Sequence, residues 1–210
     1  MAHVRKKLPA CPGDGELRYR GSAIPPVSSF PRAEDNSVYL GSFSKIGAPG
    51  VRLGWLRAPA ALLRAVTVAK QTTDLHTSTV DQAAVADYLT RTDLDRRVLS
   101  IRDTYLPRRD AMLRALDGTA PAGTTWSDPD GGMFVWVELP HGYDSARLLP
   151  YALRHEVAFV PGAPFYPAEP NRATLRLSFS SYAPDGIAEG LHRLGAALAD
   201  YVDAERPERP

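Results

Sequence analysis

The chain has 210 residues, enough for one large or two small domains, and its hydrophobic (44%) and charged (23%) fractions are those of an ordinary globular protein. The net charge of +1 gives no electrostatic case for binding nucleic acid or a membrane surface, and no apolar run has the length to cross a bilayer. A single cysteine, Cys11, excludes an internal disulfide and fits a reducing cytoplasm, and the five histidines are too scattered for a metal site. We therefore expect a cytoplasmic protein without a metal, a nucleic-acid partner or a membrane segment.

Hydrophobic periodicity predicts the elements of the first half. Residues 1–14 show no periodicity and are expected to form an unstructured tail. Residues 38–40 predict a short strand, and a second apolar run ends at Leu56. Apolar residues at helical spacing then predict three helices, over residues 62–69, 78–89 and 94–116. Pro107 lies inside the third, and an interior proline should kink or split it.

Strands and helices alternate after a Gly- and Pro-rich junction at residues 117–124. Residues 133–139 and 175–179 each alternate between large apolar and other residues, as half-buried strands do, and residues 157–160 predict a short buried strand. Asp144 is a candidate N-cap for a helix that ends near His155, and Pro184 opens an amphipathic final helix. The resulting domains are residues 15–117 and 118–203, followed by a frayed tail, residues 204–210.

The stretch over residues 38–56, VYLGSFSKIGAPGVRLGWL, gathers groups that suit a phosphate monoester and a carbonyl. The hydroxyls of Ser42 and Ser44 and the guanidinium of Arg52 can each donate to an anionic oxygen. The amine of Lys45 can form a Schiff base with a carbonyl once it has lost its proton. Pyridoxal phosphate presents both groups, but a solvated surface lysine and arginine would explain the same residues, so the spacing leaves both interpretations open.

The string GSFSKIGAPGVRLGW resembles the lysine-bearing segment of fold-type I pyridoxal-phosphate enzymes, the class I/II aminotransferases, and more narrowly their 2-aminoadipate (LysN-type) branch. The strings GGMFVWVELP, VAFVPGAPF and ATLRLSFS match the same branch, and the resemblance extends from Gly15 to Ala199. It implies an α/β chain: the C-terminal part of a pyridoxal-phosphate-binding large domain, then a small α/β domain. It also implies pyridoxal 5'-phosphate as cofactor, amino transfer from an amino acid to a 2-oxo acid, and the option of a homodimer.

The resemblance also assigns roles to individual residues. Lys45 matches the catalytic lysine that carries the cofactor and serves as base and acid in the proton shift. Ser42 and Arg52 match the groups that hold the cofactor phosphate, and Ser44 is a further candidate. Arg176 alternates with large apolar residues, which by itself favours solvent exposure. By the match, it grips the α-carboxylate of the substrate with a bidentate fork.

The chain departs from the family pattern at its beginning. Family members are much longer, so the resemblance implies a truncated chain that starts in the middle of their large domain. The family's Asp-x-x-Tyr motif, whose aspartate pairs with the pyridine nitrogen, falls on Cys11 and Asp14. We therefore expect the chain as written to be a poor aminotransferase or none. Two alternatives stay open: an aminotransferase-like effector domain of a transcription regulator, and a non-catalytic remnant.

Overall fold

The computed structural model describes residues 15–33 and 35–205, which form two compact units. Unit 1 contains the described residues up to Arg102 together with Asp130–Gly132, and unit 2 contains Asp103–Pro129 and the described residues from Met133 onward. The long helix α3, Leu94–Thr119, contributes to both. The predicted junction at residues 117–124 lies at the end of this helix, so the sequence-based domain boundary remains a prediction. The predicted tails at residues 1–14 and 206–210 lie outside the described residues.

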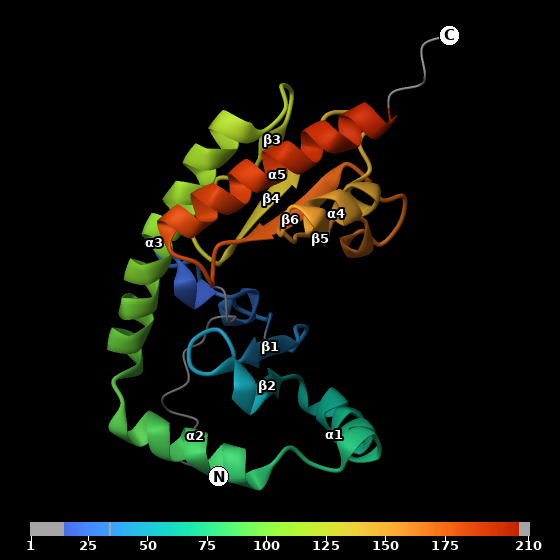
Figure 1. Ribbon diagram of the computed structural model, residues 1–210. Helices are drawn as coiled ribbons and strands as arrows, with labels where there is room; N and C mark the ends of the chain where they lie inside the picture. The colour runs from blue at the N-terminus through green and yellow to red at the C-terminus, as the bar shows by residue number, and fades with distance from the viewer. Residues whose placement is uncertain (1–14, 34, 206–210) are drawn as a thin grey trace. The chain divides into compact units, whose positions relative to one another are not determined.

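Unit 1 is built on a two-stranded antiparallel sheet and on helices (Figure 1). The strands pair in register from Tyr39 opposite Arg57 to Ser42 opposite Gly54. The elements are the 3-10 helices Gly15–Leu17, Val27–Ser29 and Pro49–Val51, the strands β1, Tyr39–Ser42, and β2, Gly54–Arg57, and the helices α1, Ala60–Asp74, and α2, Thr79–Arg91, followed by the start of α3. The two predicted strands and the three predicted helices are confirmed.

A small apolar cluster holds unit 1 together. Phe43 and Ile46, from the segment after β1, are buried with Leu89 of α2 and Val98 of α3. The Phe43 ring meets the ring of Tyr88 edge-on, with centroids 6.1 Å apart. The segment that follows β1 is therefore fixed against two helices by its own side chains.

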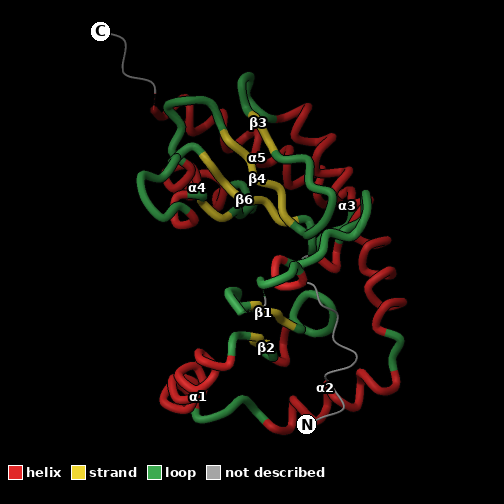
Figure 2. Tube along the Cα trace, turned by 180° about the vertical axis from the view of Figure 1, so that it is seen from behind, coloured by secondary structure: helices red, strands yellow, loops and turns green. Residues whose placement is uncertain are grey.

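Unit 2 is a four-stranded antiparallel sheet with helices on one face (Figures 1 and 2). The strand order is β3-β4-β6-β5, with β3 at Thr125–Trp126, β4 at Phe134–Glu138, β5 at Val160–Pro161 and β6 at Thr174–Ser178. The second part of α3 and the helices α4, Ser145–Arg154, and α5, Pro184–Glu205, cover the sheet, and a 3-10 helix, Ala163–Phe165, follows β5. The fold class is thus the expected mixture of helix and sheet.

The core of unit 2 follows the predicted alternation. Val135 and Val137 of β4 pair with Leu177 and Leu175 of β6, and all four side chains are buried. The apolar stripe of α5 packs on this unit's core through Ile187, Leu191, Leu194, Ala197, Leu198 and Tyr201. One face of each strand is therefore core, and the alternate residues lie on the other face.

Three local features test the expectations about single residues. Asp144 caps α4 as predicted, because its side chain accepts the N–H groups of Ala146 and Arg147. Pro107 does not split α3, which runs without a break from Leu94 to Thr119. Both Pro107 and Asp103, whose carbonyl would normally receive the missing N–H, are exposed, so water can satisfy that carbonyl. The strand predicted at residues 157–160 is wrong in extent: only Val160–Pro161 pairs with β6, and Val160 is 40% exposed.

Candidate active site

The residues predicted to hold a cofactor lie on one loop of unit 1, residues 43–53, and at its first flank. Ser42 is the last residue of β1 and pairs with Gly54, the first residue of β2. The Phe43 N–H donates to the Leu53 carbonyl at 3.0 Å, which closes the loop at its base. Ser42, Ser44, Lys45 and Arg52 are therefore carried by a single closed loop, as the sequence predicted.

Lys45 sits between two anchoring residues. Phe43 and Ile46 are buried, whereas Ser44 and Lys45 are partly exposed. Gly47 continues the turn, and a side chain there would collide with the Phe43 ring. The backbone at Lys45 is thus fixed by its neighbours while the lysine side chain keeps access to solvent.

The hydroxyl of Ser42 is oriented by the backbone of the same loop. Its Oγ accepts the N–H of Ser44 at 3.1 Å, so the backbone fixes one lone pair of the oxygen. A hydroxyl keeps one O–H donor in this arrangement, and that donor suits an anionic oxygen.

Arg52 adopts a conformation that sequence reasoning did not predict. Its φ of 51° and ψ of 34° place it in the left-handed region, directly after the 3-10 helix Pro49–Val51. For a residue other than glycine this region costs about 1–3 kcal/mol, and such strain is common at ligand sites. The exposed guanidinium donates to the Pro49 carbonyl at 3.2 Å and forms no ion pair within the described part of the chain. The Pro-Gly pair before it was the only sequence signal.

Arg176 belongs to unit 2, on the sheet face opposite the helices. It lies on β6, directly across from Trp136 of β4 and Val160 of β5. Its Cζ is 4.1 Å from the centre of the Phe134 ring and 4.8 Å from that of Phe165. The guanidinium has no hydrogen-bond or ion-pair partner among residues 15–33 and 35–205, and its Nε is buried. Simple solvent exposure is therefore not the environment of this arginine.

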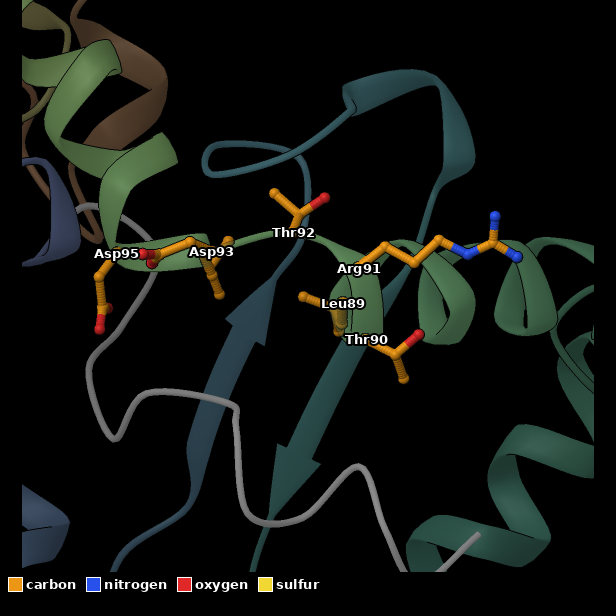
Figure 3. Close-up of a pocket in the computed structure, with 7 residues that line it drawn as sticks. Leu89, Thr90, Arg91, Thr92, Asp93 and Asp95 are labelled. Atoms are coloured by element: carbon orange, nitrogen blue, oxygen red, sulfur yellow. The ribbon is translucent and has the colours of Figure 1, made fainter.

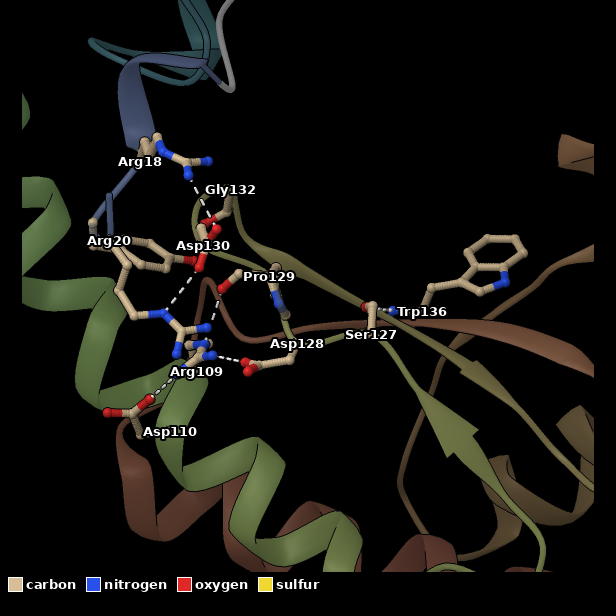
Figure 4. A network of polar contacts seen from close by, with 11 residues as sticks. Arg18, Arg20, Arg109, Asp110, Ser127, Asp128, Pro129, Asp130, Gly132 and Trp136 are labelled. Carbon is tan, nitrogen blue, oxygen red and sulfur yellow. Dashed lines mark hydrogen bonds and ion pairs between the residues drawn. The ribbon is translucent and has the colours of Figure 1, made fainter. Parts of the chain in front are cut away.

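Other arginines show what a structural arginine looks like in this protein (Figure 4). In unit 2, Arg109 is 5% exposed, forms ion pairs with Asp110 and Asp128, and donates to the Pro129 carbonyl at 3.0 Å. In unit 1, Asp130 pairs with Arg18 and Arg20, in each case at 3.1 Å. These guanidinium groups bind chain segments together, whereas that of Arg176 has no such anion.

A separate cavity of about 520 Å³ lies where α2 ends and α3 begins (Figure 3). Seven consecutive residues line it, 89–95, none of which belongs to the predicted site. Asp93 is used locally, because its Oδ1 accepts the Arg96 N–H at the start of α3. Within the described residues, His, Cys, Asp and Glu side chains form no cluster that would hold a metal, and no helix has the length and apolar character to cross a membrane.

Two predicted positions cannot be compared with the structure. Cys11 and Asp14, which fall on the family motif for the pyridine nitrogen, lie outside the described residues. Their expected effect on activity stays a prediction.

Comparisons with known proteins agree with these residues. The profile of the family "Aminotransferase class I and II" matches residues 19–194. The chain is 41% identical to aromatic-amino-acid aminotransferase 1 of Thermococcus litoralis over 90% of its own length and 45% of that protein. It is 43% identical to the 2-aminoadipate transaminase of Thermus thermophilus over 77% of its length and 40% of that protein.

Solved structures give the same answer. LysN of Thermus thermophilus, an α-aminoadipate aminotransferase complexed with N-(5'-phosphopyridoxyl)-L-leucine, superposes with a TM-score of 0.84 at 38% identity, covering 91% of this chain and 49% of that one. A multiple substrate aminotransferase of Thermococcus profundus gives a TM-score of 0.83 at 40% identity, with coverages of 92% and 48%. Transcription regulators also match, among them TauR of Rhodobacter capsulatus at 33% identity over 38% of its length. The chain spans about half the length of the aminotransferases that it matches, and it belongs to the class I and II aminotransferase family.

Proposed function

We propose that this chain acts in pyridoxal-phosphate-dependent transfer of an amino group from an amino acid to a 2-oxo acid. The observation that carries the proposal is the loop over residues 43–53, on which a lysine, an oriented hydroxyl and a guanidinium without an ion pair are held together. Family membership and the identity of 41–43% to two aminotransferases support it.

The donor set of the loop fits the cofactor. A phosphate monoester needs hydrogen-bond donors and a compensating positive charge, which the Ser42 hydroxyl and the Arg52 guanidinium supply, with Ser44 as a further donor. An aldehyde needs an amine, which Lys45 supplies. When bound, the cofactor supplies the electron-withdrawing ring that stabilises negative charge on the substrate carbon.

The chain's own residues then have separate tasks. Lys45 carries the cofactor, and its freed amine takes a proton from the substrate and returns it to another atom as a general base and acid. Arg176 binds the α-carboxylate of the amino acid in a bidentate fork, for which its N–H groups have no competing partner among the residues described.

The choice of substrate and the assembly are parts of the same proposal. The named relatives act on aromatic amino acids and on 2-aminoadipate, so we propose these donors together with leucine as first candidates. We also propose a homodimer in the cytoplasm, supported by the family and by the single cysteine. Identities of 31–33% to two transcription regulators favour an effector role less than the higher identities favour catalysis.

Covalent trapping tests the cofactor assignment. The chain is incubated with pyridoxal phosphate, reduced with borohydride and digested, and the modified peptide is identified by mass spectrometry. We expect the label on Lys45 and its loss in Lys45→Ala. The control is Lys70→Ala, since Lys70 is a helix lysine paired with Asp74, and it should keep the label. Preferential labelling of Lys6, Lys7 or Lys70 would contradict the assignment.

Turnover tests the reaction. Transamination that depends on 2-oxoglutarate is followed with 2-aminoadipate, leucine and aromatic amino acids. We expect Arg176→Lys to weaken amino-acid binding by about 1.5–3 kcal/mol, because one charged fork contact is lost, with the cofactor absorbance unchanged. Cofactor binding without turnover would favour the effector or remnant alternatives.

A further inference from the structure

The environment of Arg176 contains more than a free guanidinium, because its aromatic neighbours come from the two elements that flank β6. Phe134 lies on β4, opposite Ser178, and is therefore the diagonal neighbour of Arg176 across the strand pair. Phe165 ends the 3-10 helix that follows β5, the strand that pairs with β6 on its other side. The guanidinium extends between them.

The turn that delivers Phe165 is fixed by the backbone. Gly162 donates its N–H to the Thr174 carbonyl at 2.7 Å, and a side chain at Gly162 would collide with the Thr174 side chain. The Phe165 N–H in turn donates to the Gly162 carbonyl at 2.9 Å. The ring of Trp136 meets that of Phe165 edge-on, with centroids 5.6 Å apart and planes at 84°. Phe165 is thus held on one side by a tight turn and on another by Trp136, although about half of its surface is exposed.

Ring faces suit an arginine that must bind an anion. The negative face of an aromatic ring attracts a cation when it lies within about 6 Å of the centroid, and both contacts are inside that limit. Such rings cover the faces of the guanidinium but accept none of its in-plane N–H groups as a carboxylate would. They also limit the rotation of a long side chain before any ligand arrives, which lowers the entropy lost on binding.

We propose that Phe134 and Phe165 are positioning residues, which hold the Arg176 guanidinium so that its free N–H groups meet a carboxylate. The identity of the ligand as a substrate carboxylate rests on the proposed function, whereas the placement of the rings does not. Arg109 offers the contrast: its donors are taken by two aspartates and a carbonyl, so it has no fork left to offer.

The test uses the full chain with pyridoxal phosphate added, isotope-labelled at arginine, and pyruvate as the carboxylate probe. The Nε–H signal of Arg176 is assigned by its loss in Arg176→Lys. In the parent chain we expect an upfield ring-current shift of this signal, which moves on titration with pyruvate. Phe134→Leu should remove most of the ring-current shift and weaken pyruvate binding about fivefold, the scale of one partly desolvated cation–π contact. Phe165→Leu should weaken it about twofold, because its ring is farther away and half exposed.

Matched variants separate positioning from general stability. Phe134→Tyr keeps the ring and should restore pyruvate binding to within about twofold of the parent chain. Tyr182→Leu removes another exposed aromatic residue of unit 2 and should change neither the signal nor the affinity. If Phe134→Leu does not fold, as judged by circular dichroism, Phe165→Leu decides the test, because its ring is half exposed.

Each outcome has one meaning. Unchanged pyruvate affinity in the leucine variants, or no recovery in Phe134→Tyr, overturns the positioning role. Borohydride labelling of Lys45 without any response of Arg176 to pyruvate overturns the carboxylate subsite but leaves the cofactor assignment standing. Failure of both labelling and response overturns the proposed function as well.

Discussion

Helices α1 and α5 have similar apolar periodicity and opposite environments. On α5, Ile187, Leu191 and Leu194 are at most 5% exposed, because the helix packs on the core of unit 2. On α1, no residue is buried, and Leu62 and Leu63 are 47% and 43% exposed. An apolar stripe therefore predicts that a helix has a face to bury, but it does not identify the surface that covers this face.

Local contacts are what α1 has in the described part of the chain. The Thr67 hydroxyl donates to the Leu63 carbonyl at 2.7 Å, and Lys70 pairs with Asp74 one turn on. Isolated helices of this length are marginal in water, and exposed ion pairs add only about 0.3–0.5 kcal/mol. We therefore expect the two regions to differ strongly in their response to mutation.

The largest effect is expected for Phe179→Ala in unit 2. Phe179 is fully buried and meets the Tyr105 ring edge-on at 6.2 Å, so its removal should cost about 3–5 kcal/mol of unfolding free energy. Urea unfolding is followed by tryptophan fluorescence in a Trp55→Phe background, which leaves the two tryptophans of unit 2. Phe30→Ala, at a residue 54% exposed, is the control and should change stability by less than about 0.5 kcal/mol. Equal effects of the two variants would contradict the assignment of the core.

Ile46→Ala probes the smaller cluster of unit 1. Ile46 is 1% exposed and anchors the Lys45 loop, and we expect a cost of about 2 kcal/mol, at the low end because a small cluster can collapse into the gap. Hydrogen exchange of the amides of α2 and β2 measures it. The same variant should reduce cofactor trapping at Lys45. Retention of full protection and full trapping would show that the loop does not depend on this anchor.

Asp144→Ala removes the cap of α4. Two N–H groups would lose their side-chain acceptor, at a cost of about 1 kcal/mol. Asp144→Ser keeps an acceptor and should recover most of the loss in thermal unfolding. No difference between alanine and serine would refute capping as the cause.

Leu63→Gln on α1 tests the comparison directly. Because Leu63 is exposed and glutamine is also a good helix former, stability should change by less than about 0.5 kcal/mol. Leu191→Gln, at the equivalent face of α5, is the matched variant and should cost several times more. A cost above about 2 kcal/mol at Leu63 would show that a surface covers α1 in solution.

The smallest effect concerns pH. Hydrogen bonding and charge attraction from Arg193 lower the pKa of Glu189 below its ordinary value of 4.5, on the exposed surface of α5. The folded state then holds its proton less tightly than the unfolded state, so the contribution to stability is present above pH 4.5 and fades as the pH falls through the lowered pKa. A carboxyl NMR titration should show the pKa of Glu189 rising in Arg193→Gln. An unchanged titration would remove Arg193 as the cause.

Much of the fold was readable because it depends on neighbours in sequence. The strand alternation at residues 133–139, the N-cap at Asp144 and the stripe of α5 were each predicted and confirmed. The reading failed at Pro107, because the tolerance of a helix for proline depends on whether water reaches the freed carbonyl. It also gave β5 the wrong extent, because an apolar run does not state which of its residues find a pairing partner.

The candidate site divides in the same way. The sequence by itself determined the Lys45 loop, since Ser42, Ser44, Lys45 and Arg52 are close along the chain and a hairpin must bring the ends of the loop together. It did not determine the left-handed backbone of Arg52 or the aromatic contacts of Arg176. Phe134, Phe165 and Arg176 lie far apart along the chain, and their apolar strings were equally well explained as core strands and a turn. Only the register of β4, β6 and β5 decided that these two rings face an arginine, because strand pairing joins residues that no local pattern connects.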